Sequence, residues 1–240
     1  MCCTVTEWMD LEELGRLLAM VDVFELLPPE ELLALASDAS LERLGAGEKM
    51  MVGPTGEHAR RVIVVLSGRA TVYEPGPRGR RLTVSVAEAA TLVGAAGFSE
   101  RPRGLRLEAS MPCVLCLLGR EAFEGVVRRN PEVGLRLLRV LGERIGVLEE
   151  RLADMAHREV PARLASAILR LVEGEGVMGT EGGWLRTRYT HQQLASMIGA
   201  NREAITRALK TLRERGAVEV RGRRIHVVDR EALKRAAWED

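Results

Sequence analysis

The stretch that decides the fold runs from Thr190 to Arg215 and has the sequence THQQLASMIGANREAITRALKTLRER. Thr190 is a good N-cap, and Gln193, three residues on, completes a capping box, so a short helix should begin here. That helix would bury an apolar stripe made of Leu194, Met197 and Ile198. Gly199 then supplies a tight turn in which a positive φ is tolerated. The first part of the stretch therefore predicts a short capped helix that ends in a turn.

A second helix should follow this turn, with Asn201 as its N-cap. Its apolar positions recur at i, i+3, i+4 and i+7, and they are Ile205, Ala208, Leu209 and Leu212. The opposite face carries Arg202, Glu203 and Arg207 near the start of the helix. Arginine can bond both O6 and N7 of guanine, and a carboxylate can accept a hydrogen bond from N4 of cytosine. Because recognition helices contact bases through their N-terminal residues, the stretch predicts a DNA-binding helix-turn-helix.

Two amphipathic helices around a glycine also occur in all-α proteins, where an arginine-rich face is simply solvated. The flanking sequence favours DNA. Residues 217–228 alternate around Gly222, which predicts a small β-hairpin, a wing that can rest on phosphates. Ten Lys/Arg and three Asp/Glu lie between Trp184 and His226, a net charge of +7, whereas the whole chain carries only +1. Such segregation of charge is typical of a nucleic-acid-binding face.

Residues 201–207 have the sequence NREAITR and residues 190–195 have THQQLA. Together with the glycine-centred wing, they resemble the cyclic-AMP receptor protein/FNR superfamily of bacterial transcription regulators. The resemblance covers about residues 20–228 and is stronger in the C-terminal third. It implies that Arg202, Glu203 and Arg207 contact the bases of a TGTGA-like half-site.

The resemblance also implies contacts around these base-reading residues. Thr190 and Gln192 match positions that touch the DNA backbone, and Arg221 and Arg223 match positions on the wing. Asn201, at the start of the second helix, is also expected to be a DNA-binding residue. The partners implied are double-stranded DNA and RNA polymerase, for an activator or a repressor of promoters that carry an inverted repeat.

The N-terminal half has a different pattern. Residues 10–20 and 28–37 predict helices, the second of which starts at a pair of prolines. From 41 to 118, short β-rich runs are separated by Gly and Pro, and the clearest are 62–73, 82–86, 105–109 and 113–117. Such runs predict a compact antiparallel barrel or sandwich. In the resembled family this is the β-roll effector domain, whose characteristic glycine between strands matches Gly68.

Residues 131–157 predict one long helix. Apolar residues recur along it at alternating spacings of three and four, and they are Leu138, Leu141, Ile145, Leu148, Leu152 and Met155. This a/d seam of period 3.5 favours a two-helix coiled coil, although the seam could instead pack against the chain's own barrel. A palindromic operator needs two recognition helices one DNA turn apart, which favours a homodimer.

The sequence from 157 to 161 breaks the helical pattern, because Pro161 suits the first turn of a new helix over 162–172. A glycine-rich loop is expected over 174–183. We therefore expect an α+β protein with a hinge near Pro161. Its three parts would be a β-roll sensor domain with N-terminal helices (1–130), a coiled-coil dimerisation helix (131–158) and a winged helix-turn-helix DNA-binding domain (159–240).

The resembled family holds a cyclic nucleotide with a Gly-Glu-Leu stretch and an Arg about ten positions on. Here Gly94 and Arg103 match that cassette, but Ala95 replaces the glutamate that meets the ribose. The helix positions that offer hydroxyls to the adenine correspond to Leu148 and Glu149. Unpaired polar groups of the ligand would cost about 1–3 kcal/mol each. DNA binding independent of cyclic AMP is therefore expected, with a cyclic-nucleotide-responsive regulator as the alternative and the effector left open.

FNR-type members of the family hold an iron–sulfur cluster with four cysteines. This chain also has four, Cys2, Cys3, Cys113 and Cys116. Cys113 and Cys116 are three apart on an expected strand, so they should point to opposite faces, which is poor geometry for one metal. Buried apolar thiols and no cofactor or metal are therefore expected, and a cysteine- or redox-responsive regulator remains an alternative.

No Ser/His/Asp elbow, P-loop or HExxH pattern occurs, so no catalytic residue is predicted and an enzyme is not expected. The competing class is a ligand-sensing module without DNA activity, which would not need the basic wing. The chain has 240 residues with 46% hydrophobic and 29% charged, enough for two small domains. No apolar run approaches the roughly 20 residues needed to span a bilayer. Residues 1–8 also lack the features of a secretory signal, so a cytoplasmic location without a membrane partner is expected.

Overall fold

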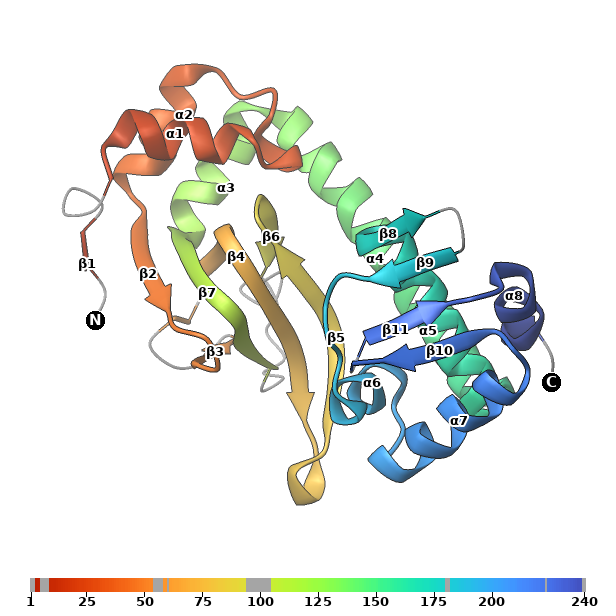
Figure 1. Ribbon diagram of the computed structural model, residues 1–240. Helices are drawn as coiled ribbons and strands as arrows, with labels where there is room; N and C mark the ends of the chain where they lie inside the picture. The colour runs from red at the N-terminus through yellow and green to blue at the C-terminus, as the bar shows by residue number, and fades with distance from the viewer. Residues whose placement is uncertain are drawn as a thin grey trace. The chain divides into compact units, whose positions relative to one another are not determined.

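The computed structural model describes residues 3–4, 9–53, 58–59, 61–93, 105–179, 182–222 and 224–238 (Figure 1). Contacts divide the chain into two compact units, one of Met1–Gly79 and Val84–Ile145, the other of Arg80–Thr83 and Gly146–Asp240. The long helix α4 (Pro131–His157), with the bounds predicted, contributes to both units. In these described ranges, every helix is too short or too polar to cross a lipid bilayer.

The first unit combines N-terminal helices and the start of α4 with a seven-stranded sheet, of which only the first three residues of one strand, β5, fall in the second unit. Its helical elements are α1 (Leu11–Ala19), the 3-10 turn η2 (Asp22–Phe24), α2 (Pro29–Ser37), the 3-10 turn η3 (Pro77–Gly79) and α3 (Arg120–Arg129). Its strands are β1 (Cys3–Thr4), β2 (Ser40–Leu44), β3 (Lys49–Val52), β4 (Arg61–Pro75), β5 (Arg81–Glu88), β6 (Thr91–Val93) and β7 (Leu105–Gly119). The order is β1-β2-β7-β4-β5, with β3 on β7 and β6 on β4. The antiparallel architecture predicted for this region is therefore present.

Both faces of β4 over 62–66 and of β7 over 115–118 are buried, which explains why these strands have continuous apolar runs there. Val62 and Val64 pack with the helical residues Phe24 and Phe123 in one cluster. Ile63 and Val65 pack in a second cluster on the other face of the sheet. Because successive strand residues point to opposite faces, a strand covered on both sides has little use for polar positions.

The segments 105–109 and 113–117 were expected to be separate strands, and this was wrong, because β7 runs without a break from Leu105 to Gly119. A proline normally interrupts a strand because it lacks a donor. Here Pro112 lies opposite a bulge in β4, where the register shifts on both sides of Ser67. Gly68 sits in that bulge with φ +90°, and a Cβ there would collide with the Pro112 carbonyl oxygen. The bulge therefore explains both the continuous strand and the need for glycine at 68.

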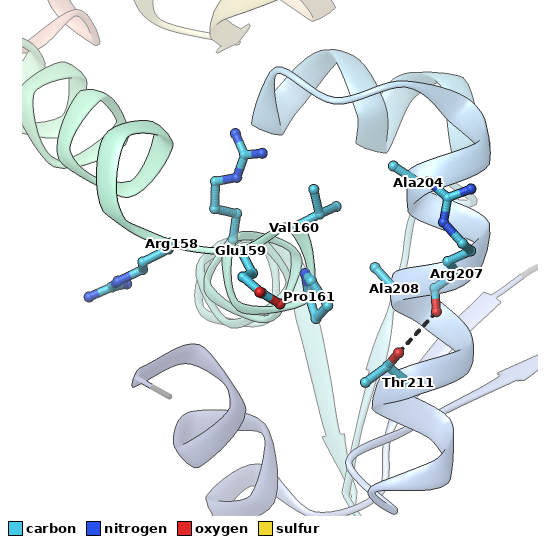
Figure 2. Close-up of a pocket in the computed structure, with 9 residues that line it drawn as sticks. Arg158, Glu159, Val160, Pro161, Ala204, Arg207, Ala208 and Thr211 are labelled. Carbon is cyan, nitrogen blue, oxygen red and sulfur yellow. Dashed lines mark hydrogen bonds between the residues drawn. The ribbon is translucent and has the colours of Figure 1, made fainter. Parts of the chain in front are cut away.

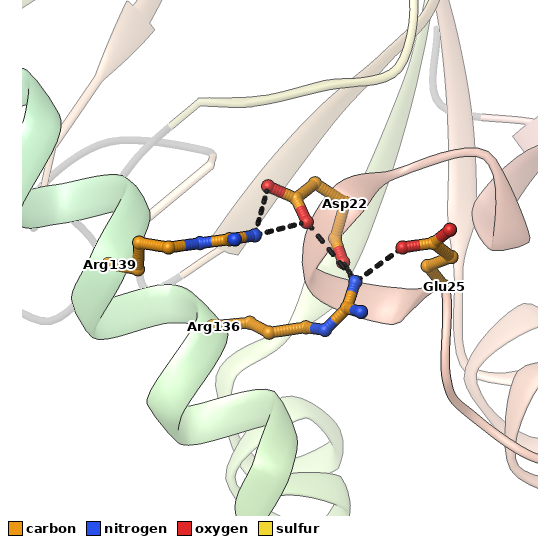
Figure 3. Close-up of polar contacts among 4 residues, drawn as sticks. All are labelled: Asp22, Glu25, Arg136 and Arg139. Carbon is orange, nitrogen blue, oxygen red and sulfur yellow. Dashed lines mark hydrogen bonds and ion pairs between the residues drawn. The ribbon is translucent and has the colours of Figure 1, made fainter.

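The start of α4 is fixed to the N-terminal helical segment by ion pairs (Figure 3). Arg136 Nη1 lies 2.6 Å from Glu25 Oε2 and donates to the Asp22 carbonyl oxygen at 2.7 Å. Arg139 Nη2 bridges both carboxylate oxygens of Asp22 at 2.9 and 3.0 Å. Leu137 of these turns packs against the core of the unit, while Leu135 and Leu138 remain exposed.

The second unit holds the C-terminal part of α4 and a four-stranded sheet among four further helices. The helices are α5 (Val160–Glu175), α6 (His191–Ile198), α7 (Arg202–Glu214) and α8 (Arg230–Trp238). The strands are β8 (Gly176–Gly179), β9 (Gly182–Leu185), β10 (Val218–Arg221) and β11 (Arg224–Val227), in the order β10-β11-β9-β8. Their apolar faces form one core. The hairpin predicted around Gly222 is confirmed, with Val218 opposite Val227 and Arg221 opposite Arg224.

The glycine-rich segment 174–183 was expected to be a loop, and this was wrong. Residues 160–175 continue α5 past the predicted end at Val172, and β8 then pairs with β9, with Val177 opposite Trp184. Strand β9 also pairs with β11 of the wing, which places Trp184 opposite His226. A strand that is held by a distant partner needs no strong local propensity, which is why the sequence signal was weak.

Candidate nucleic-acid interface

The first helix of the predicted helix-turn-helix, α6, begins with the expected capping box. The Thr190 Oγ1 accepts a hydrogen bond from the Gln193 backbone N–H at 3.1 Å. In return, the Thr190 backbone N–H donates to Gln193 Oε1 at 2.8 Å. Gly199 ends the helix in the left-handed region with φ 64°, as predicted. Local sequence therefore fixes both ends of this helix.

The second helix, α7, begins at the predicted cap. Asn201 Oδ1 accepts a hydrogen bond from the Ala204 backbone N–H at 2.7 Å. The four predicted apolar positions are buried in the core of the unit, and they are Ile205, Ala208, Leu209 and Leu212. This burial orients the helix, so its remaining faces are turned outward.

Arg202, Glu203 and Arg207 are exposed on the first two turns of α7. Among the described residues, none of these three side chains forms a hydrogen bond or an ion pair with another residue. Two guanidinium groups and one carboxylate are therefore available to hydrogen-bond with an external ligand. Arg202 and Glu203 lie in the first turn of α7. The positive end of the helix dipole lies at the same turn, and it favours the binding of an external anion there.

The other predicted DNA contacts differ in how far they are already used within the unit. Thr190 and Asn201 hold the two helix starts through their side chains, while Gln192 is exposed on α6. Arg221 is exposed on the wing and forms an ion pair with Glu219 of the same strand. Arg223 lies outside the described residues. Thr190 and Asn201 therefore combine a structural role with any role in DNA binding.

Two residues that hold the helix-turn-helix together were not singled out from the sequence. His191 Nδ1 lies 2.9 Å from Thr206 Oγ1 and connects the start of α6 to α7. Arg163 Nη1 donates to the Ile198 carbonyl oxygen at 3.0 Å, at the end of α6. A cation suits this position because the last carbonyls of a helix carry partial negative charge. Both contacts join residues far apart in the sequence, so no local pattern could indicate them.

A groove of about 360 Å³ lies between the start of α5 and the side of α7 that faces it (Figure 2). Val160 and Pro161 form one side, and Arg207 and Thr211 form the other. The charged side chains that lie along it are Arg163 and Arg207, against the single carboxylate of Glu159, while the Arg158 side chain extends away from α7. The groove is therefore basic, and it borders the predicted base-contacting helix.

The predicted effector residues Gly94 and Arg103, and also Ala95, lie outside the described residues. Leu148 and Glu149 are exposed on α4. No group of three or more His, Cys, Asp or Glu side chains within the described ranges is arranged to hold a metal ion.

Cys113 and Cys116 are both buried, and they belong to different hydrophobic clusters on opposite faces of the sheet. The prediction that the two thiols point to opposite faces is therefore confirmed. Burial raises the pKa of the Cys116 thiol to about 12, so the thiolate is scarce at neutral pH. Burial also raises the pKa of Cys113, and the backbone N–H of Arg69 only partly offsets this effect.

A capped helix-turn-helix followed by a two-stranded wing, with arginines at the start of its second helix, defines a winged-helix DNA-binding domain. Residues 162–236 match the family described as the Crp-like helix-turn-helix domain. Residues 53–130 match the family described as the cyclic nucleotide-binding domain. The chain belongs to the CRP/FNR superfamily and is a transcription regulator of the CRP family with a helix-turn-helix DNA-binding domain.

Curated relatives match over much of the chain. A CRP-like cAMP-activated global transcriptional regulator from Mycobacterium tuberculosis is 26% identical over 227 residues, which cover 93% of this chain and all of the relative. A global nitrogen regulator from Nostoc is 29% identical over 175 residues, which cover 72% of this chain and 78% of the relative. By name, both relatives are regulators rather than enzymes.

Solved structures share the fold. The c-di-GMP-responsive regulator CLP from Xanthomonas campestris superposes with a TM-score of 0.72 at 19% identity, over 84% of this chain and all of that chain. A CooA mutant from Carboxydothermus hydrogenoformans gives a TM-score of 0.71 at 20% identity, over 83% of this chain and 88% of that chain. The predicted α+β fold, with a β-roll, a long helix and a C-terminal winged helix, is therefore confirmed.

Proposed function

We propose that this regulator is a homodimer that binds an inverted repeat of TGTGA-like half-sites and does so without cyclic AMP. In this proposal residues 1–130 form the sensor domain, 131–158 the dimerisation helix and 159–240 the DNA-binding domain. RNA polymerase is the partner through which the bound dimer would affect transcription.

The observation that carries the proposal is the exposure of Arg202, Glu203 and Arg207 on the first two turns of α7. Arginine bonds O6 and N7 of guanine, and a carboxylate accepts from N4 of cytosine, so these groups suit a GC-containing half-site. The basic groove beside Arg207 and the exposed Arg221 on the wing offer charges for the flanking phosphates.

The dimer is supported by the uncovered side of α4. Of the 27 residues in this helix, all of them described, Val133 alone is buried. The seam residues with large exposed fractions, from 43% to 69%, are Leu138, Ile145, Leu148, Leu152 and Met155. A contiguous apolar stripe of this kind is costly in water and is typical of an interface. A second copy of the chain is the natural occupant, since the a/d spacing is self-complementary.

Independence of cyclic AMP is supported by the residues on α4 that would face the base. Leu148 offers no hydrogen bond, and Glu149 would place a negative charge beside a negatively charged ligand. By name, one relative is cAMP-activated and another is a global nitrogen regulator, so likeness to these relatives does not by itself imply activation by cyclic AMP. A cysteine sensor has less support, because Cys113 and Cys116 are buried apart from each other.

The test is a titration of purified protein on a TGTGA-like palindrome and on a scrambled duplex, with and without cyclic AMP. We expect a specificity ratio of at least about 1,000, and a change of less than about fivefold in operator affinity when cyclic AMP is added, below the usual allosteric coupling. Calorimetry should detect no cyclic-AMP binding in the micromolar range. A gain in operator affinity of about tenfold or more would contradict cyclic-AMP independence, and equal binding to both duplexes would contradict the operator.

A further inference from the structure

The junction between α4 and α5 consists of two residues, Arg158 and Glu159, which lie outside both helices. The Arg158 N–H donates to the Asp154 carbonyl oxygen at 3.0 Å, and the Glu159 carbonyl oxygen accepts from the Arg163 N–H at 3.0 Å. The soft torsions between these two anchored groups leave the direction of α5 open to adjustment by side chains packed around the junction. The second unit contains residues 146–157 of α4 together with all of α5, so these contacts can be followed within one compact body.

Arg158 contacts three elements that meet at this junction. Its Nη1 lies 3.0 Å from Asp154 Oδ1 in the last turn of α4 and 3.3 Å from Ser166 Oγ on α5. Its guanidinium carbon lies 4.8 Å from the ring centre of Trp238 on α8, within cation–π distance. The side chains of Arg158 and Asp154 are only 22% and 13% exposed, so this ion pair is better shielded than an ordinary surface pair.

Asp154 also faces a second arginine, because Arg170 Nη1 on α5 lies 3.9 Å from its Oδ2. A single carboxylate at the end of α4 therefore attracts one cation at the junction and another further along α5. The Trp238 side chain is 76% exposed, so its contact with Arg158 does not arise from burial in the core. This arrangement suits a role in orientation better than a role in core stability.

We propose that Arg158 is a positioning residue, which joins Asp154, Ser166 and Trp238 and thereby sets the direction in which the winged helix leaves α4. This proposal rests on the proposed function, because the direction affects affinity only when two copies bind one inverted repeat. The two recognition helices must lie about 34 Å apart to enter successive major grooves. A junction without Arg158 would present them at variable spacing, and operator binding would then have to select the correct arrangement.

A direct contact between Arg158 and a DNA phosphate is the alternative explanation for any loss of binding, since Arg158 also lies along the groove beside α7. In Figure 2 its side chain extends away from α7. The two explanations predict different effects of removing the Asp154 carboxylate. If Arg158 is a positioning residue, the removal disrupts its contact and weakens operator binding. If Arg158 contacts a phosphate, the removal frees Arg158 for that contact and leaves affinity unchanged or higher.

The experiment compares Arg158→Ala, Asp154→Ala and Trp238→Ala with the control Glu173→Ala. The control removes an ion pair of 3.0 Å between Glu173 on α5 and Arg230 on α8, which does not involve α4. We expect each junction variant to weaken operator binding by about 2- to 30-fold, the range of mutations that alter coupling between sites. The control should match the wild type. Binding to a scrambled duplex and the dependence of log K on log salt should stay unchanged in all four variants.

Several outcomes would overturn the proposal. One is an Arg158→Ala variant that binds the operator as tightly as the wild type. Another is a loss of affinity in Arg158→Ala alone, with the slope of log K against log salt lowered by about one, which identifies a phosphate contact.

If Arg158→Ala does not fold, Trp238→Ala still tests the proposal, since it removes an exposed side chain. If the wild type binds no operator, the proposed function has failed instead, and small-angle scattering without DNA tests the junction. The junction variants alone should then broaden the distance distribution, and an unchanged distribution rejects the positioning role.

Discussion

The helices α4 and α7 are both amphipathic, but they turn opposite faces outward. The shorter helix, α7, buries its apolar residues Ile205 and Leu212 in the core of its own unit and exposes charged side chains. The longer helix, α4, buries Val133 alone and exposes leucines along most of its length. Amphipathicity by itself therefore does not indicate a partner. The chemistry of the face left uncovered does, and it favours nucleic acid for α7 and a second apolar helix for α4.

The most severe challenge to this comparison is a charge in the seam of α4. Ile145→Asp would place two carboxylates opposite each other in a buried stripe, at a cost of several kcal/mol for each desolvated charge. We expect light scattering at micromolar concentration to show a monomer. The exposed Glu149→Gln serves as the control and should remain a dimer. A wild-type monomer under these conditions would contradict the assignment of the seam.

The next test compares the same truncation on the two helices. Leu212 of α7 is fully buried, so Leu212→Ala should lower the free energy of unfolding of the DNA-binding unit by about 2–5 kcal/mol. Leu152 of α4 is 69% exposed, so Leu152→Ala should leave that free energy nearly unchanged and weaken only dimer association. Chemical denaturation at several protein concentrations separates the two effects. Equal losses of unfolding free energy would remove the distinction between the helices.

The charged face of α7 is tested by Arg202→Ala, with Lys210→Ala as a control that removes the same charge further along the helix. Arg202→Ala should cost about 1–3 kcal/mol on the palindrome and flatten the preference at one base pair. The control should leave the ratio of specific to non-specific affinity unchanged, because Lys210 lies beyond the N-terminal turns. An unchanged ratio in Arg202→Ala would rule out base contact by this residue.

The smallest expected effect is on the wing. Arg221→Ala should weaken all duplexes to a similar extent and lower the slope of log K against log salt by about one, as the loss of a single phosphate contact requires. Competition assays at three or more salt concentrations give the slope. A sequence-dependent loss would mean that the wing takes part in base readout, and a role for Arg221 limited to phosphates would then be wrong.

The features that sequence predicted correctly depend on neighbouring residues. The caps Thr190 and Asn201, the left-handed Gly199 and the wing around Gly222 all follow from side chains within a few positions of each other. The bounds of α4 follow from Pro131 and the break after His157. Such local signals survive in any tertiary context that does not oppose them.

The features that were missed depend on distant partners. β8 exists because β9 is held by the wing strand β11, and β7 runs through Pro112 because Gly68 forms a bulge opposite it. Helices α3 and α8 were also not among the predicted elements, although the start of α8 has a local signal. Asp229 Oδ1 accepts hydrogen bonds from the backbone N–H groups of Glu231 and Ala232, as an N-cap does.

The leucine face of α4 would link the state of the regulator to its abundance in the cell. Association that covers this face obeys mass action, so the share of paired chains rises with the number of chains. Dilution by cell growth would then lower operator occupancy before any small molecule is made or consumed. A regulator built in this way would respond to the output of its own gene as well as to a ligand.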